Sequence, residues 1–211
     1  MIIAVDGPTA SGKGTIAQRL AAHYGLKRLD TGSLYRAVGL AVLDAGAEPA
    51  EEAAAVAAAE ALDISSIDET RIRSSAAGLA ASKVAALPAV RAVLRRAQRS
   101  FALDPAGAVL DGRDIGTVIC PDAEVKLFVT ASPAVRTGRR LKELRARGES
   151  ISFEALQAQI AERDQRDMNR ADSPLRQAPD AHLLDTTELS VDAAAAAAIA
   201  IVEATLAKLG A

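Results

Sequence analysis

A glycine-framed loop directly after a short apolar run constrains this chain more than any other feature. The run from Ile2 to Val5 leads into the segment GPTASGKGT, which spans Gly7 to Thr15. Glycines let a backbone turn tightly enough for successive N–H groups to face an anion, and a lysine in such a loop reaches outer phosphates. A helical pattern follows from Thr15 to Tyr24, and the N-terminus of a helix adds its positive dipole end to the site. The sequence therefore predicts a phosphate-binding loop between a buried strand and a helix.

The spacing inside the loop departs from the commonest phosphate-binding pattern. In GxxxxGK[ST] a metal-binding hydroxyl follows the lysine, whereas here Gly14 follows Lys13 and Thr15 comes one residue late. The form GxxxxGKGT resembles the loop of small P-loop kinases that phosphorylate nucleoside monophosphates and other small acceptors. The alternative is a glycine-rich turn that only packs. The predicted ATP-binding residues are Gly7, Pro8, Thr9, Ala10, Ser11, Gly12, Lys13, Gly14 and Thr15.

Five short apolar runs alternate with helical patterns along the chain. The runs predict strands at 2–5, 26–29, 108–110, 125–129 and 182–184. The helical patterns lie at 33–45, 71–87, 89–102, 133–147, 152–168 and 191–209. The alanine-rich, acidic segment 48–60 has little to bury, so a mobile surface helix is expected there. Such interleaving predicts an α/β fold of three layers, with helices on both faces of a five-stranded parallel sheet. At 211 residues, a single domain is expected.

Charge and cysteine content narrow the classes of partner. The net charge of −2 and the isoelectric point near 5.8 provide no global attraction to nucleic acid or to an anionic membrane. No basic leader and no membrane-length apolar stretch stand out, so cytoplasmic residence without a membrane partner is expected. The single cysteine, Cys120, cannot form an internal disulfide, and no Cys/His cluster has metal-ligand spacing. No metal ligand is assigned, and with no long heptad seam a monomer is expected.

The helical pattern at 152–168 changes from apolar to charged along one face. The stripe of Phe153, Leu156 and Ile160 continues in phase at Arg163, Asp167 and Arg170. Burying these groups would be costly unless they met opposite charge, which a polyphosphate or a phosphate acceptor would supply. A solvated, salt-bridged helix face is the alternative.

A second arginine group lies in the helical pattern at 133–147. Arg136, Arg139 and Arg140 share one face and suit a cationic lid over ATP, with Arg139 and Arg140 assigned to ATP binding. Solvated charge is the rival interpretation for three further residues, which are left out of the site: Lys142, Arg145 and Arg147. Such a group fits phosphoryl transfer, which demands alignment and charge neutralisation more than covalent help.

Polar residues follow several predicted strands, where ligands bind in parallel sheets. DTGS starts at Asp30 and DGRD starts at Asp111. Asp111 either orients Mg²⁺ through water or caps the turn after its strand. Both readings stay open.

Five strings together resemble bacterial-type cytidylate kinases, in order and over nearly the whole chain. They are GPTASGKGT, DTGSLYR, SKVAALPAVR, DGRDIGT and ERDQRDMNR. The resemblance implies a P-loop kinase fold, a mobile acceptor-binding insert at about 46–100, and a mobile lid at about 133–150. It implies ATP-dependent phosphorylation of CMP, and also of dCMP, with Mg²⁺ bridging the ATP phosphates. The rivals are a related kinase with another small-molecule or nucleoside monophosphate acceptor, and an ATP-binding switch without turnover.

The resemblance also implies roles for individual residues. Lys13 would stabilise the migrating phosphoryl group, Arg36 would hold the acceptor phosphate, and Thr31 would lie near that phosphate. Ser82, Arg91 and Asp114 match cytosine-reading positions, and a carboxylate with hydroxyl and guanidinium groups would distinguish cytosine from uracil. Arg113 would contact phosphate, Asp167 and Arg163 would hold the sugar, and Arg170 would bridge the phosphate chains. The implied catalytic set is Lys13, Arg113, Arg163 and Arg170.

The chain departs from the family between Leu62 and Ser82. Family members usually carry a longer, strand-rich insert there, which closes over the pyrimidine nucleotide. The segment ISSIDETRIRSS has room for little beyond a helix start. A shortened insert predicts looser closure over the base, and it leaves the ribose or deoxyribose preference and the discrimination against UMP open.

Overall fold

The apolar runs of the sequence form strands, and helices cover the side chains of these strands. The computed structural model describes residues 1–210, apart from the side chain of Ser65. The strands are β1 (Ile2–Asp6), β2 (Lys27–Asp30), β3 (Ala108–Gly112), β4 (Val125–Thr130) and β5 (His182–Asp185). The α-helices are α1 (Lys13–Tyr24), α2 (Thr31–Asp44), α3 (Glu52–Glu60), α4 (Ser75–Val84), α5 (Pro88–Ala102), α6 (Pro133–Arg145), α7 (Phe153–Asn169) and α8 (Val191–Leu209). Shorter turns are η1 (Ile64–Ser66), η2 (Arg71–Arg73) and η3 (Ile115–Ile119).

The five strands form one sheet in the order β2-β3-β1-β4-β5. β1 pairs in parallel with β3 and β4, and β4 pairs in parallel with β5. In this register Ile3 lies opposite both Val109 and Val125. The predicted α/β class and all five predicted strands are confirmed, each strand running on into polar or glycine residues at its carboxyl end.

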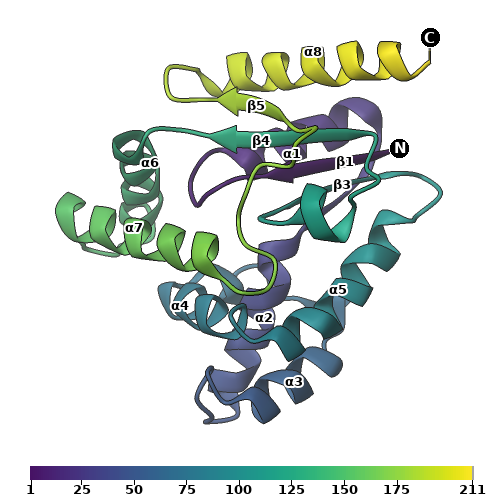
Figure 1. Cartoon of the computed structure of the whole chain (residues 1–211). Helices are drawn as coiled ribbons and strands as arrows, with labels where there is room; N and C mark the ends of the chain where they lie inside the picture. The colour runs from purple at the N-terminus through teal and green to yellow at the C-terminus, as the bar shows by residue number, and fades with distance from the viewer. Residues whose placement is uncertain (211) are drawn as a thin grey trace. The chain divides into compact units, whose positions relative to one another are not determined.

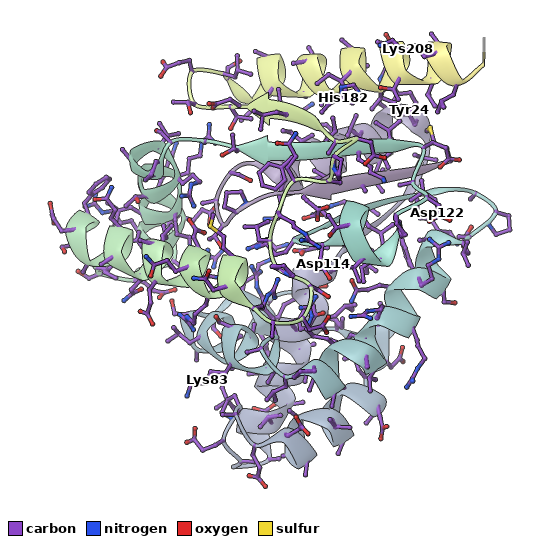
Figure 2. All side chains as sticks on the ribbon, in the orientation of Figure 1. Tyr24, Lys83, Asp114, Asp122, His182 and Lys208 are labelled. Atoms are coloured by element: carbon purple, nitrogen blue, oxygen red, sulfur yellow. The ribbon has the colours of Figure 1, made fainter. Side chains whose placement is uncertain are left out.

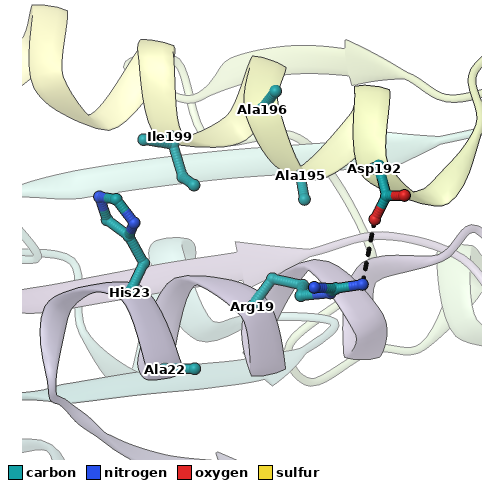
Figure 3. Close-up of a pocket in the computed structure, with 7 residues that line it drawn as sticks. All are labelled: Arg19, Ala22, His23, Asp192, Ala195, Ala196 and Ile199. Carbon is teal, nitrogen blue, oxygen red and sulfur yellow. Dashed lines mark hydrogen bonds and ion pairs between the residues drawn. The ribbon is translucent and has the colours of Figure 1, made fainter.

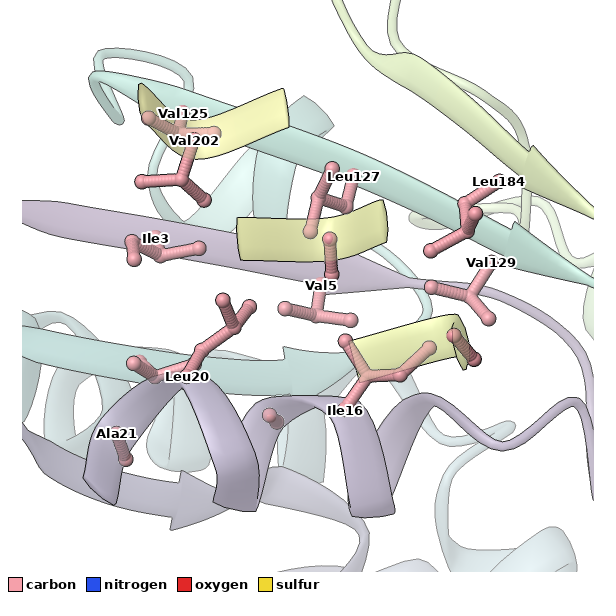
Figure 4. Packing of buried hydrophobic residues seen from close by; sticks show 14 residues of the cluster. Ile3, Val5, Ile16, Leu20, Ala21, Val125, Leu127, Val129, Leu184 and Val202 are labelled. Carbon is pink, nitrogen blue, oxygen red and sulfur yellow. The ribbon is translucent and has the colours of Figure 1, made fainter. Parts of the chain in front are cut away.

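One hydrophobic core lies between the sheet and the helices α1 and α8 (Figures 1 and 4). Ile3 and Val5 of β1 point into it and are fully buried, as are Leu20 of α1 and Val202 of α8. Burying a side chain of this size contributes roughly 1.5–3 kcal/mol. The apolar side of α8 is thereby docked on the sheet, and the loop that precedes α1 is fixed to a rigid base.

The chain divides into two compact units. The first comprises residues 1–28 and 104–211, and the second comprises residues 29–103, a range that includes the predicted insert at 46–100. Within the second unit, α2 packs against α3 and α4, and α3 packs against α5. That the whole chain is a single domain stays a prediction.

Two expectations about the second unit need correction. The helix near 48–60 is expected to have little to bury, but Ala55 and Ala59 of α3 are buried, and α3 packs against both α2 and α5. Alanine permits this because its small side chain lets helices approach closely. The helical pattern from Arg71 yields only a short turn, and α4 begins at Ser75, because the Ser74 hydroxyl accepts a hydrogen bond from the N–H of Ala77 and caps the helix there.

No single helix among the described residues is long and apolar enough to cross a membrane. By length and composition alone, α4 and α5 pass that test together, with a bend of 103° between them.

Gly39 of α2 marks a close approach between α2 and α4 in the second unit. A Cβ at this position would lie 2.8 Å from the Ala80 Cβ and 2.9 Å from the Ala81 nitrogen, both in α4. Gly78 of α4 is the matched control, since a Cβ there would meet nothing within 4 Å. We expect Gly39→Ala to lower the free energy of unfolding by about 1–3 kcal/mol, because the helices must move apart. Gly78→Ala should raise it by up to ~1 kcal/mol through helix propensity. Chemical denaturation followed by circular dichroism measures both, and equal effects would contradict the close packing.

Candidate functional site

The predicted phosphate-binding loop lies between β1 and α1 and packs tightly against the sheet. A Cβ on Gly7 would lie 2.0 Å from the carbonyl oxygen of Val129, so only glycine fits where the loop leaves β1. Ala10 and Gly12 adopt left-handed conformations, with φ of 59° and 93°. Left-handed residues within a turn direct successive N–H groups to one side, which is the geometry of an anion-binding nest.

The outer side of this loop is bound by arginines from α6. Arg136 donates from Nη1 to the carbonyl oxygen of Thr9 at 3.2 Å, and Arg139 donates from Nη1 to that of Ser11 at 3.2 Å. The Thr186 hydroxyl donates to the same Ser11 oxygen at 2.9 Å and accepts from Arg139 at 2.9 Å. In a trans peptide the N–H points opposite to the C=O. The N–H groups of the residues that follow Thr9 and Ser11 are therefore turned away from these arginines.

Lys13 is the first residue of α1, and its Nζ lies 3.4 Å from the carbonyl oxygen of Pro8 across the loop. The ammonium therefore lies over the loop rather than along the helix. This placement brings the charge and the nest together, as the sequence predicts.

A buried ion pair ties α6 to α7 behind the loop. Arg136 Nη1 lies 2.7 Å from Asp164 Oδ2, and both side chains are almost fully buried. An apolar contact between the two helices adds to this pair and comprises Leu141, Leu144, Leu156 and Ile160. Because the same guanidinium also holds Thr9, the segment predicted as a lid is joined to the loop in this structure. That the segment is mobile stays a prediction.

Arg113 links the loop to the charged end of α7. Its Nε donates to Asp167 Oδ2 at 2.9 Å, and its Nη2 donates to the Thr9 hydroxyl at 2.9 Å. Arg170 Nη1 lies 3.9 Å from Asp167 Oδ1. Three of the predicted residues, Arg113, Asp167 and Arg170, are thus brought together.

The electrostatics of this cluster hold Asp167 ionised. Burial acts to raise the pKa of the Asp167 carboxyl, but the charges of Arg113, Arg163 and Arg170 outweigh it, so the pKa lies below its usual range. Arg163 therefore belongs to the cluster as predicted. Arg166 lies on the neighbouring face, is exposed and pairs with Glu162 at 3.6 Å. For this residue the alternative of a solvated, salt-bridged helix face therefore applies.

Asp114, labelled in Figure 2, follows β3. A second carboxylate, that of Asp6, holds the turn after it in place. The two oxygens of Asp6 each accept a hydrogen bond at 2.8 Å, one from Ile115 N and one from Gly116 N. Burial raises the pKa of Asp6 to about 7, and the nearby charge of Asp114 adds to the rise, while the two backbone hydrogen bonds oppose it. Asp114 is itself buried.

Four of the predicted acceptor-binding residues lie in the second unit. Thr31 is buried at the start of α2, which Asp30 caps by accepting from Gly32 N at 2.9 Å. Arg91 of α5 is buried, with its guanidinium carbon 5.6 Å from the centre of the Tyr35 ring. Arg36 of α2 and Ser82 of α4 are partly buried.

The remaining predicted residues of α6 have defined partners. Arg139 donates through Nη2 to the carbonyl oxygen of Thr186 at 2.8 Å, besides its contact with Ser11. In this structure Arg139 therefore binds the loop from its outer side. Arg140 pairs with Glu143 at 2.9 Å near the surface. Their predicted contacts with ATP stay predictions.

A shallow hollow of about 430 Å³ lies between α1 and α8 (Figure 3). It is lined by Ala22, Ala195, Ala196, Ile199, His23 and the exposed ion pair of Arg19 with Asp192. None of these residues belongs to the predicted site. The hollow is a groove between packed helices, away from the clustered charges.

Three further residues contact the candidate site but were not predicted from the sequence. Asp6 was overlooked because the apolar run of β1 ends one residue before it. Asp164 follows the buried Ile160 by four residues, a spacing that places it on the inward face, so the signal was present. Arg28 of β2 is bound to Asp111 of β3, at 3.0 Å between Nη2 and Oδ1, and no pattern in the sequence points to it.

Comparisons with known proteins agree with the predicted resemblance. The family model described as cytidylate kinase matches residues 3–204. A cytidylate kinase of Rhodopseudomonas palustris is 59% identical over 204 residues, which covers 97% of this chain and 97% of that protein. A cytidylate kinase of Azorhizobium caulinodans is 61% identical over 203 residues, which covers 96% of this chain and 98% of that protein.

Solved structures resemble the fold at lower identity. A crystal structure of an uncharacterized protein from Eubacterium ventriosum has a TM-score of 0.58 at 15% identity, covering 96% of this chain and 98% of that one. An unliganded sugar kinase from a Janibacter species has a TM-score of 0.51 at 15% identity, covering 96% and 94%. These likenesses concern the fold alone.

The raised pKa of Asp6 predicts a pH-dependent stability. Its pKa is near 3.8 unfolded and about 7 folded, so the folded protein binds more protons between these values. The stability contributed by protonated Asp6 is complete below about pH 4 and is lost as the pH rises through about 7. Between about pH 5 and 8, the free energy of unfolding of the native protein should therefore fall relative to that of Asp6→Asn. Denaturant titrations across this range measure the difference, and parallel profiles would rule out the shift.

Proposed function

The chain belongs to the cytidylate kinase family, and from this premise we propose that the residues described above transfer the γ-phosphoryl group of ATP to CMP, and to dCMP. The observation that carries the proposal is the loop at the start of α1. Arginines hold its carbonyl oxygens from outside, and Lys13 lies over it. Such a loop is suited to bind the phosphates of the donor nucleotide.

The cluster around Asp167 supplies the charge that phosphoryl transfer needs. The transferred group carries negative charge spread over three oxygens, and catalysis consists mainly of alignment and neutralisation. Asp167 and the Thr9 hydroxyl fix the Arg113 guanidinium in place before any substrate binds. We assign Lys13, Arg113, Arg163 and Arg170 to contacts with the phosphates. Asp167 is assigned to the sugar, which Arg163 contacts in addition to the phosphates.

The second unit supplies residues for the acceptor. Arg36 extends from α2 and is proposed to bind the phosphate of CMP, beside the Thr31 hydroxyl. Ser82 and Arg91 are proposed to hydrogen-bond to cytosine, whose amino group, ring nitrogen and carbonyl differ in donor pattern from uracil. Asp114, fixed by the turn that Asp6 holds, is proposed as the carboxylate that accepts from the cytosine amino group.

The chemistry of Asp111 fits a divalent cation as part of the donor site. Its Oδ2 lies 3.6 Å from the position that a Cβ on Gly14 would take, so a carboxylate stands against the loop. Oxygen ligands suit Mg²⁺, and among the described residues no group of three acidic, His or Cys side chains gathers to bind one. Phosphate oxygens and water would complete the shell. When bound, Mg²⁺ neutralises charge on the donor phosphates.

The proposal predicts which acceptor is used. With ATP as donor, CMP and dCMP should be phosphorylated faster than UMP, AMP or shikimate, because among these acceptors only cytosine combines an amino donor for Asp114 with both a ring nitrogen and a carbonyl acceptor. A coupled assay of ADP release measures each rate, and ADP production should depend strictly on the acceptor. Faster turnover of AMP or shikimate would reject the cytosine assignment, and ATP binding without any turnover would favour a switch.

A substitution at Arg36 tests the acceptor site separately. Arg36→Ala should raise the KM for CMP by roughly tenfold to a hundredfold and leave the KM for ATP within about twofold, because a charge-assisted bond to the acceptor phosphate is lost. Arg71→Ala is the control, since this arginine pairs with Asp44 on the surface of the same unit. Steady-state kinetics with each substrate varied in turn measure the split. An equal rise in both KM values would contradict the assignment.

A further inference from the structure

The turn η3 begins directly after Asp114, and a carboxylate from another strand caps it. Asp6 Oδ1 accepts a hydrogen bond from Ile115 N, and Asp6 Oδ2 accepts one from Gly116 N, both at 2.8 Å. The first N–H groups of a helical turn have no partner within the turn, so they need an acceptor from outside. Asp6 supplies both acceptors from the carboxyl end of β1.

Asp114 itself occupies the N-cap position of this turn, where an aspartate usually caps with its own side chain. Its side chain makes no such bond, although its backbone carbonyl accepts from Val118 N at 2.9 Å and from Ile119 N at 3.1 Å. Asp114 has a further interaction of its own, but capping of η3 by its side chain is not part of it. The usual task of an N-cap aspartate is therefore carried out by Asp6.

The position of Asp6 suits it to hold this turn firmly. Its backbone pairs with Gly112 of β3 on one side and with Phe128 of β4 on the other, and the residue is buried. The turn packs closely against it, because a Cβ on Gly116 would lie 3.4 Å from Asp6 Oδ2 and 3.1 Å from Lys126 Cδ. The turn therefore has little room to shift while Asp6 is in place.

The buried lysine beside the turn pairs elsewhere. Lys126 Nζ donates to the carbonyl oxygen of Pro121 at 2.7 Å and to Asp180 Oδ2 at 2.7 Å. Only the aliphatic part of Lys126 therefore approaches Gly116. The Asp6 oxygens are met by backbone N–H groups rather than by this ammonium.

The segment around Asp114 is also tied to the phosphate-binding loop. Asp6 directly precedes Gly7, the first residue of that loop, and Arg113 donates from Nη2 to the Thr9 hydroxyl at 2.9 Å. The residues on both sides of Asp114 are thus anchored at the start of the loop. A carboxylate carried by a segment anchored in this way need not be reorganised when a ligand arrives.

We propose that Asp6 is a positioning residue for recognition of the acceptor base, because it caps η3 in place of Asp114 and so keeps the Asp114 carboxylate directed at the amino group of cytosine. This inference deepens the proposed function and rests on it, since it takes Asp114 as the residue that reads the base. Without Asp6, the N–H groups of the turn would draw the Asp114 carboxylate into the turn as their cap. Discrimination against uracil, which carries a carbonyl in place of the amino group, would then be lost.

Asp6→Asn tests this role through the choice of acceptor. An amide has only one oxygen, so one of the two N–H groups loses its acceptor. At about pH 8, above the Asp6 pKa of about 7, kcat/KM for CMP should fall roughly tenfold to a hundredfold. For UMP it should stay unchanged or rise, because a displaced Asp114 no longer repels the uracil carbonyl. The KM for ATP should stay within about twofold of the native value. Coupled assays of ADP release measure all three.

A double-variant cycle separates positioning from general damage. Asp114→Ala removes the carboxylate that reads the base. Adding Asp6→Asn to it should change the ratio of the CMP and UMP values by less than about twofold, because Asp6 acts on this ratio through Asp114. Circular dichroism checks that each variant is folded. Asp6→Ser, whose smaller side chain introduces no amide donor, replaces Asp6→Asn if the latter does not fold.

Asp104→Asn is the matched control. Asp104 Oδ1 also accepts from a backbone N–H, that of Ala106 at 2.9 Å, but in the loop before β3, at the opposite end of that strand from Asp114. This substitution should leave kcat/KM for both acceptors unchanged.

Failure of this role and failure of the proposed function give different results. An equal fall in kcat/KM for CMP and UMP in Asp6→Asn, an unchanged ratio, or additive effects in the double variant overturns the positioning role of Asp6. Native protein that phosphorylates UMP as fast as CMP instead overturns the proposed reading of cytosine by Asp114, and the role of Asp6 falls with it.

Discussion

The phosphate-binding loop works only if its carbonyl oxygens face away from the ligand, and those oxygens need partners. Arg136 and Arg139 bind two of them from α6, and Lys13 lies against a third. A peptide unit whose oxygen is held outward presents its N–H to the opposite side. The arginines that the sequence assigns to a lid therefore hold the loop from the side opposite to its N–H groups in this structure.

Charge is arranged around this loop in pairs of one carboxylate and one guanidinium. Asp167 pairs with Arg113, Asp164 with Arg136 and Asp111 with Arg28, and in each pair the carboxylate is buried. Removing one partner of such a pair typically costs about 3–5 kcal/mol, because it strands a buried charge. The pairs therefore fix guanidinium groups in advance, and electrostatic catalysis depends on groups that need not reorganise.

Most of the fold could be predicted from the sequence, whereas the roles of the candidate site residues stay predictions. Alternating apolar runs and helical patterns located the five strands, because a buried parallel strand reads as a short continuous apolar run. The predicted strands stop short because their last residues, such as Asp6 and Asp185, are polar yet paired in the sheet or its loops. Ion pairs between distant residues, such as that of Arg28 and Asp111, left no signal, because no local pattern encodes which cation meets a buried carboxylate. The second unit's buried alanines were missed for a related reason, since alanine is equally common on exposed helices.

The order of strands in the sheet has a consequence for synthesis of the protein. β1 is central, yet Ile2 pairs with Ala108 and Ile3 with Val125, so neither neighbour exists when the N-terminus leaves the ribosome. At about 5–20 residues per second, translation needs on the order of 5–20 s to deliver them. Residues 29–103 are contiguous and are complete before β3 and β4 are made. β1 can therefore pair with its two neighbouring strands only after residues 29–103 have been synthesised.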